Sequence, residues 1–288
     1  MREYEIKANG KINLGLDVVG KREDGYHLVR MVMQSVRLYD RLEFTRTKTP
    51  NIAIESNLRF LPVNENNLVY KAIEMIRKNY GITEGLHVKL DKRIPVAGGM
   101  AGGSSDAAAT LKAMNSMFEL GITEEKLNEY ALKLGADVPY CLMGGTALAE
   151  GIGEKLTKLD PVPDAHVLLV KPPISVSTPA IYSKYDEMQG LTHPDIDGIM
   201  SAIKAKDIKA ICERMGNILE PVTISSNPVI SDIKERIRLL DADGVLMSGS
   251  GPTVFAVFTD RKAAEHAFYE FKGGEYSRGT YLTAFANT

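Results

Sequence analysis

Residues 95–109, PVAGGMAGGSSDAAA, constrain this chain more than any other segment. Glycines fill four of the six positions from 98 to 103, and glycine lets a backbone adopt positive φ and approach a ligand closely. Ser104, Ser105 and Asp106 then precede an alanine run, which predicts a helix whose first N–H groups these side chains cap. A glycine-rich loop that leads into a helix N-terminus is typical of an anion site, most often a phosphate site.

The loop does not match two common phosphate-binding motifs. A Walker A motif has a lysine and a hydroxyl residue directly after its glycines, whereas Ser104 and Ser105 follow Gly103 here without a lysine. The glycine spacing also differs from G-x-G-x-x-G, which disfavours a dinucleotide-binding fold. A tight turn that only packs a helix against a strand is the alternative, and the added hydroxyls and helix start argue against it.

The composition is ordinary for a soluble globular protein. With 288 residues, 44% hydrophobic and 25% charged, the chain is long enough for about two domains. The net charge of −2 predicts no general attraction to nucleic acid or to an acidic membrane, and no apolar run is long enough for a membrane span. The charged N-terminus MREYEIKANGK lacks a signal peptide, and two cysteines suit a reducing cytosol, so we expect a cytoplasmic protein.

Strand and helix patterns alternate without a regular βαβ repeat, which predicts an α+β fold. The expected strands are 11–19, 32–37, 41–45, 51–55, 85–91, 144–151, 166–173, 244–247, 253–258 and 279–285. The expected helices are 66–79, 105–118, 123–134, 196–205, 207–216, 228–240 and 261–271. Prolines and charges concentrate in 158–164, which places a boundary between an N-terminal domain, 1–160, and a C-terminal domain, 161–288.

Two charged residues far apart in the sequence could share one reaction centre. In KINLGLDVV (11–19) apolar residues alternate with polar ones, so Lys11 and Asn13 lie on one strand face, which is either functional or simply solvated. Asp137 lies in the short connector ADVPY (136–140), where a turn or cap role is the alternative. If Lys11 and Asp137 meet, the carboxylate could accept a hydroxyl proton and the ammonium could stabilise a transferred phosphoryl group.

Two further segments could contact ligands. MSGSGPTVFAVF (247–258) is a second glycine cluster, which is either a hairpin loop or a second phosphate-facing loop that meets the first. Tyr26 and His27 follow a turn, and an aromatic ring beside an imidazole could stack on a base and hydrogen-bond its edge. Tyr182 is a second aromatic residue expected in an exposed loop, and an ordinary turn flank is the alternative for both segments.

The chain resembles the GHMP kinases along nearly its whole length. Four segments carry the resemblance in the family's order: KINLGLDVVGKREDGYH (11–27), IPVAGGMAGGSSDAAA (94–109), LGADVPY (134–140) and MSGSGPTVFA (247–256). Within the superfamily, the pattern is similar to kinases that phosphorylate the 2-hydroxyl of a cytidine diphosphate-linked methylerythritol in the non-mevalonate isoprenoid pathway. The resemblance implies a two-domain fold with the active site in the cleft between domains, a small-molecule substrate, ATP and Mg²⁺.

The resemblance also implies a role for each site residue. Lys11 and Asp137 match the catalytic pair, with Asp137 as the base. The substrate-binding residues are Asn13, Tyr26, His27, Thr178 and Tyr182, of which the two tyrosines sandwich the cytosine and His27 recognises its edge. The ATP phosphate loop comprises Pro95, Ala97, Gly98, Gly99, Met100, Ala101, Gly102, Gly103, Ser104 and Ser105. The loop that closes the site comprises Ser248, Gly249, Ser250 and Gly251, and no residue is assigned as a metal ligand, since Mg²⁺ often relies on phosphates and water.

Small departures from the family pattern do not change this assignment. Asn9 and Gly10 precede Lys11 where alanine is more usual, and Met100 stands where leucine is frequent. One alternative function is another GHMP kinase, such as mevalonate or homoserine kinase, which needs no cytosine clamp. The other is a catalytically silent binding protein of the same fold, which the presence of both Lys11 and Asp137 disfavours. The sequence does not indicate an oligomeric state.

Overall fold

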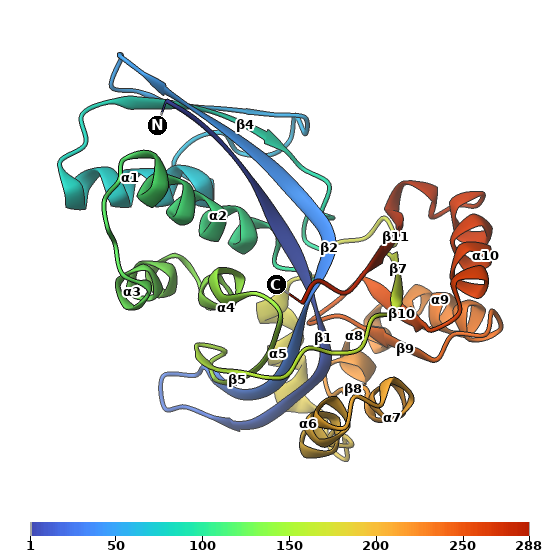
Figure 1. Ribbon diagram of the computed structural model, residues 1–288. Coiled ribbons are helices and arrows are strands. Elements are labelled where there is room, and N and C mark those ends of the chain that lie inside the picture. The colour runs from blue at the N-terminus through green and yellow to red at the C-terminus, as the bar shows by residue number, and fades with distance from the viewer. Residues whose placement is uncertain (1, 288) are drawn as a thin grey trace. The chain divides into compact units, whose positions relative to one another are not determined.

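The computed structural model describes residues 2–287 and confirms the α+β fold (Figure 1). The chain divides into two compact units that interleave in the sequence. Unit 1 comprises Met1–Gly10, Tyr39–Val96 and Ala101–Met143, and unit 2 comprises Lys11–Leu38, Ala97–Met100 and Gly144–Thr288. The boundary near residue 160 and the placement of the active site stay predictions.

Unit 1 pairs a sheet with helices. Its strands are the first part of β1 (Glu3–Lys21), the last part of β2 (His27–Thr47), β3 (Ile52–Ser56) and β4 (Gly85–Asp91). β4 pairs antiparallel with β2 and parallel with β3. Its helices are α1 (Leu68–Tyr80), α2 (Gly102–Met117), α3 (Glu124–Leu134) and α4 (Val138–Met143). Apolar side chains of these strands and helices, such as Phe44, Ile73 and Met114, form one buried core.

Unit 2 contains the other ends of β1 and β2 and a separate four-stranded sheet. β2 pairs with β5 (Thr146–Gly151), β5 with β6 (Lys155–Lys158), and β1 with β8 (Gly216–Asn217). The second sheet has the order β11-β7-β10-β9, formed by Thr280–Ala284, His166–Val170, Val254–Phe258 and Gly244–Met247. The helices are α5 (Thr178–Glu187), α6 (Ile196–Lys204), α7 (Ile208–Arg214), α8 (Glu220–Ser226), α9 (Val229–Arg238) and α10 (Arg261–Lys272). α9 and α10 pack on the second sheet, where apolar residues of both layers form the core (Figure 1).

Several expected elements differ from the structure. β1 and β2 are far longer than the short strands expected at 11–19, 32–37 and 41–45. The expected connector 136–140 contains the start of α4, and Tyr182 lies on α5 rather than in a loop. No apolar periodicity predicted α5, because Ile181 is the only buried residue of this helix. The strand β6 and the helix α8 were not expected either.

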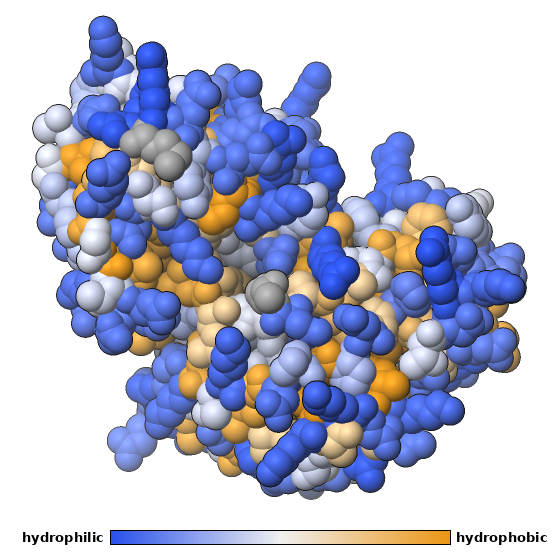
Figure 2. Space-filling model, in the orientation of Figure 1, coloured by the Kyte–Doolittle hydropathy of each residue, from blue (hydrophilic) through white to orange (hydrophobic). Residues whose placement is uncertain are grey.

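Hydrophilic side chains cover most of the face drawn in Figure 2, with apolar residues in groups among them. Within residues 2–287, no helix combines the length and apolar character that crossing a membrane requires.

Candidate active site

Helix α2 begins without the predicted side-chain cap. The helix starts at Gly102, and its N-cap residue Ala101 has φ 54 and offers no side-chain acceptor. Ser105 is buried and its hydroxyl instead donates to the carbonyl of Asn9 at 2.6 Å, so the capping prediction was wrong. Because no side chain of its cap accepts from them, the first N–H groups of α2 are open to an acceptor such as phosphate.

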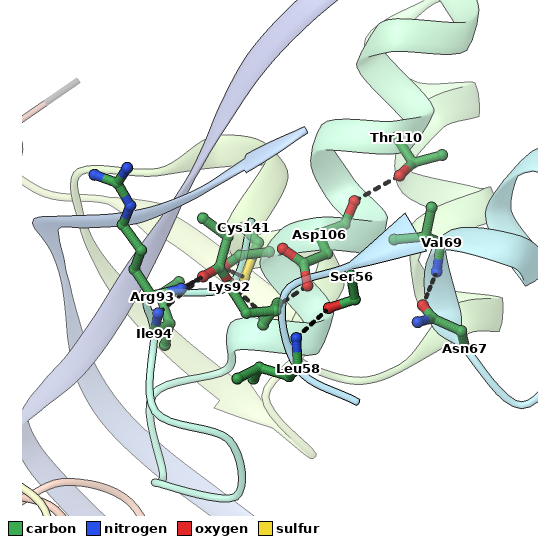
Figure 3. A network of polar contacts seen from close by, with 12 residues as sticks. Ser56, Leu58, Asn67, Val69, Lys92, Arg93, Ile94, Asp106, Thr110 and Cys141 are labelled. Carbon is green, nitrogen blue, oxygen red and sulfur yellow. Dashed lines mark hydrogen bonds and ion pairs between the residues drawn. The ribbon is translucent and has the colours of Figure 1, made fainter. Parts of the chain in front are cut away.

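A buried ionic cluster lies at the start of α2 (Figure 3). Lys92, just after β4, donates to Asp106 on α2 at 2.7 Å and also to Asp40 on β2. The second oxygen of Asp40 accepts the backbone N–H groups of Arg93 at 2.6 Å and Ile94 at 2.8 Å. The cluster therefore ties three segments of unit 1 together at the entry to the glycine loop.

A single ammonium in this cluster forms ion pairs with both buried carboxylates. Burial alone would lower the pKa of Lys92, but the carboxylates of Asp106 and Asp40 outweigh it and raise that pKa. Burial also raises the pKa of Asp106, whose Oδ1 has no hydrogen-bond partner among the described residues. A Cβ atom on Gly102 would lie 3.2 Å from Lys92 Nζ, so the ammonium lies directly against the first turn of α2.

The polar face of β1 is buried, which excludes the solvated alternative. Lys11 is 5% exposed and Asn13 is fully buried. Lys11 Nζ donates to Asn13 Oδ1 at 2.7 Å, and Asn13 Nδ2 donates to the sulfur of Met31 at 3.4 Å. No carboxylate in the described part of unit 2 forms an ion pair with Lys11. An anionic ligand would offset the cost of burying this ammonium.

Residues 97–100 of the first glycine loop meet the second glycine cluster within unit 2, which was one of the two alternatives open from the sequence. The hydroxyl of Ser248 donates to the carbonyl of Gly99 at 3.0 Å. Gly99 has φ +75, and a Cβ atom there would lie 2.3 Å from the carbonyl oxygen of Ser248. The segment 248–251 also joins the paired strands β9 and β10, so it is both a hairpin connection and a contact surface for residues 97–100. That these loops bind phosphate stays a prediction.

Two residues that sequence reasoning missed hold the closing loop. Asn217 donates to the carbonyls of Met247 and Gly249, both at 2.8 Å, and Thr223 donates to the carbonyl of Ser250 at 3.2 Å. Both side chains are buried. The only signal in the sequence is that each is a polar residue within an apolar stretch.

The predicted substrate residue Thr178 is brought to the same loop. Its hydroxyl shares a hydrogen bond of 2.7 Å with the hydroxyl of Ser250. Thr178 begins α5, so the start of this helix is tied to the closing loop.

Replacing Gly99 by alanine is expected to destabilise unit 2 and to weaken ATP binding. Alanine at a left-handed φ costs about 1–2 kcal/mol, and here its Cβ would also force the two loops apart. Thermal unfolding and titration calorimetry with ATP measure the two effects. Gly121→Ala is the matched control, because Gly121 has φ +62 but nothing within 4 Å of the added Cβ. Equal losses in both variants would show that contact between the loops does not matter.

The predicted base-binding residues are partly assembled. His27 at the start of β2 lies beside Tyr182, with ring centroids 4.8 Å apart and planes tilted by 30°. The ring of Tyr185 lies nearly perpendicular to the same imidazole, at 84°, with centroids 5.9 Å apart. Tyr26 is 62% exposed in the preceding turn. Asp186, which sequence reasoning missed, lies 2.7 Å from His27 Nε2.

The predicted base, Asp137, lies in unit 1, immediately before α4. It is half-buried, and its carbonyl accepts the N–H of Cys141 at 3.1 Å. Lys11 belongs to unit 2, so its pairing with Asp137 stays a prediction. Among residues 2–287, no three His, Cys, Asp or Glu side chains are grouped so as to hold a metal ion.

Comparison with known proteins identifies the family. The model of the GHMP kinases N terminal domain matches residues 67–145, and that of the GHMP kinases C terminal matches residues 199–274. A 4-diphosphocytidyl-2-C-methyl-D-erythritol kinase of Lachnoclostridium phytofermentans is 52% identical over 97% of this chain and 96% of its own length. Its counterpart in Lachnospira eligens is 56% identical over 91% of both chains. This chain belongs to the 4-diphosphocytidyl-2-C-methyl-D-erythritol kinase family.

Solved structures agree with this family membership. A crystal structure of a 4-(cytidine 5'-diphospho)-2C-methyl-D-erythritol kinase matches with a TM-score of 0.85 at 29% identity, covering 99% of this chain and 100% of that one. A homoserine kinase from Cytophaga hutchinsonii, at 21% identity and a TM-score of 0.77 over 100% and 95% of the two chains, shares the fold alone. The expected GHMP kinase fold is confirmed.

One departure from the usual pattern of this kinase family has a simple structural account. Met100 is 1% exposed, and its carbonyl accepts the N–H of Lys11 at 3.1 Å. A leucine would fill a similar volume and leave this backbone contact unchanged. Methionine therefore preserves the link between the glycine loop and β1.

Proposed function

We propose that this kinase transfers the γ-phosphoryl group of MgATP to the 2-hydroxyl of 4-diphosphocytidyl-2-C-methyl-D-erythritol. The products are the 2-phosphate and ADP, and the reaction serves the non-mevalonate synthesis of isoprenoid precursors. The observation that carries the proposal is the match, over nearly the full length of both chains, to kinases named for this substrate.

In the proposed mechanism, Asp137 and Lys11 act on the reacting centre. Asp137 accepts the proton of the substrate hydroxyl as the new P–O bond forms. Lys11 neutralises charge on the transferred phosphoryl group, and Asn13 holds its ammonium through the hydrogen bond of 2.7 Å. The burial of Lys11 without a carboxylate partner in the described part of unit 2 supports an anionic ligand there.

The ATP phosphates are proposed to bind the glycine loop, residues 95–105, and the first N–H groups of α2. The closing loop, residues 248–251, completes this phosphate site. The uncapped start of α2 and the contact between Ser248 and Gly99 support the assignment. Mg²⁺ is proposed to arrive with ATP and to be held by phosphate oxygens and water, so no protein ligand is assigned.

The cytosine base is proposed to lie between Tyr26 and Tyr182, with His27 at its edge. Substrates of mevalonate or homoserine kinases carry no base, so this clamp distinguishes the proposal from those activities. The juxtaposition of His27 and Tyr182 and the exposure of Tyr26 support it.

A panel of alcohols tests the proposed function. Purified protein with ATP and Mg²⁺ is expected to release ADP with the cytidyl substrate, and not with mevalonate or homoserine. ADP release with mevalonate alone would favour another kinase activity. No ADP with any alcohol would favour the silent binding protein.

Replacing Tyr26 by alanine is expected to raise KM for the cytidyl substrate by roughly 5- to 150-fold, since stacking on a base contributes about 1–3 kcal/mol. The KM for ATP and the melting temperature should stay nearly unchanged, because the tyrosine is 62% exposed. Steady-state kinetics with each substrate varied in turn measure the effect. Tyr269→Ala, which removes a tyrosine that is 69% exposed on α10, is the control. A similar rise in both KM values would contradict the clamp.

A cytoplasmic location is also part of this proposal. Cys141 and Cys212 form no disulfide with each other, which supports a reducing environment. Burial raises the pKa of the Cys212 thiol to about 12, so this thiol is protected from reaction.

A further inference from the structure

Asp186 on α5 contacts the side chains of two other residues of unit 2. Its Oδ2 accepts from Lys21 Nζ at 2.6 Å, and its Oδ1 lies 2.7 Å from His27 Nε2. Hydrogen bonds from Lys21 and His27 hold the pKa of Asp186 below its usual range. The group facing His27 is therefore a carboxylate, which can only accept hydrogen bonds.

This contact determines which nitrogen of His27 carries a proton. Because the carboxylate only accepts, Nε2 must donate, and Nδ1 of the neutral ring is then an acceptor. The side chain of His27 is 9% exposed, and Tyr182 and Tyr185 pack against its ring at 4.8 and 5.9 Å. Among the described residues no hydrogen bond to Nδ1 is found, so Nδ1 is the one polar atom of the imidazole left for a ligand.

We propose that Asp186 is a specificity-determining positioning residue, which fixes His27 as an Nδ1 acceptor and thereby selects a base with an amino group. Cytosine presents a 4-amino donor, whereas uracil presents a 4-oxo acceptor at the same place. An acceptor at Nδ1 pairs with the first and opposes the second. The inference rests on the proposed cytidyl recognition and adds the residue that distinguishes cytosine from uracil.

The tautomer can be measured without substrate. Long-range proton–nitrogen NMR on the full chain with ¹⁵N-labelled histidine is expected to show His27 protonated at Nε2 only, with His27→Gln providing the assignment among five histidines. In Asp186→Leu the ring is expected to become a mixture of tautomers. A wild-type ring that is protonated at Nδ1, doubly protonated at neutral pH or already mixed would overturn the inference.

Kinetics then test specificity. Asp186→Leu is expected to lower the ratio of kcat/KM for the cytidyl substrate to that for its uridyl analogue by roughly 10-fold or more, mainly through KM. Asp186→Asn should retain much of the ratio, because its amide oxygen can still accept from Nε2. Lys21→Met is the matched control, since it removes the other partner of Asp186 and leaves the bond to His27 in place.

The outcomes separate this inference from the proposed function. An unchanged ratio in Asp186→Leu, or an equal loss for both substrates with the tautomer intact, would overturn the role of Asp186. If the wild-type enzyme phosphorylates neither substrate, the proposed function fails, and an Nε2-only ring in the NMR spectrum would still support the positioning of His27 by Asp186.

Discussion

Replacing Asp137 by asparagine is expected to lower kcat by roughly 10²- to 10⁴-fold, which is the usual contribution of a positioned general base. Asparagine keeps the size of the side chain but cannot accept the hydroxyl proton. The Kd for ATP should stay nearly unchanged, because the nucleotide is proposed to bind the glycine loop. Steady-state kinetics and titration calorimetry measure the two quantities separately.

The matched control for this variant is Asp241→Asn. Asp241 is exposed after α9 and has φ 57, a conformation that asparagine tolerates. The Asp241→Asn variant should therefore keep full activity. Full activity in Asp137→Asn would remove Asp137 from the role of base. A large rise in the Kd for ATP with unchanged kcat would instead place Asp137 in nucleotide binding.

Replacing Lys92 by methionine is expected to lower the free energy of unfolding by about 3–5 kcal/mol, the usual cost of breaking a buried ion pair by removing one partner. Methionine fills most of the same volume but leaves Asp40 and Asp106 buried without a cation. Because the ammonium lies against Gly102, the variant should also weaken ATP binding. Urea unfolding followed by circular dichroism measures the stability.

Lys126→Met is the control, because it removes an exposed pair with Glu129 that should contribute no more than about 1 kcal/mol. The pH dependence adds a second readout. The pKa of Lys92 is raised above its ordinary 10.5, so its stabilisation is fully present below that pH and is lost as the pH rises through the raised value. If Lys92→Met and Lys126→Met lowered the free energy of unfolding by the same small amount at neutral pH, the role of the buried cluster would be contradicted.

Local patterns in the sequence predicted much of this fold correctly. The helix expected at 123–134 matches α3, which Thr123 caps by accepting the N–H of Lys126 and which ends at Gly135. The order of the four segments that carry the resemblance also identified the GHMP kinase family, because those residue types occur together for a shared chemistry. These features depend on neighbours along the chain, and the sequence therefore contains them directly.

Other features depend on residues that are remote in the sequence. Ser105 and Asp106 look like helix caps, yet they bind Asn9 and Lys92, which packing brings to them. Alternation in β1 indicated a polar face at Lys11, but whether that face is covered depends on other strands, including the one that carries Met31. Periodicity shows which residues share one face of a strand, but it does not show what packs against that face.

By itself the sequence determined the fold class, the glycine loops and the family, since each follows from local spacing and residue type. Only the tertiary structure decided that Lys11 is buried, that Ser248 contacts Gly99 and that Asp186 faces His27. These three facts are contacts between segments distant in the chain, set by how the sheets and helices of unit 2 pack. Packing of that kind is a property of the whole folded unit, which no local pattern encodes.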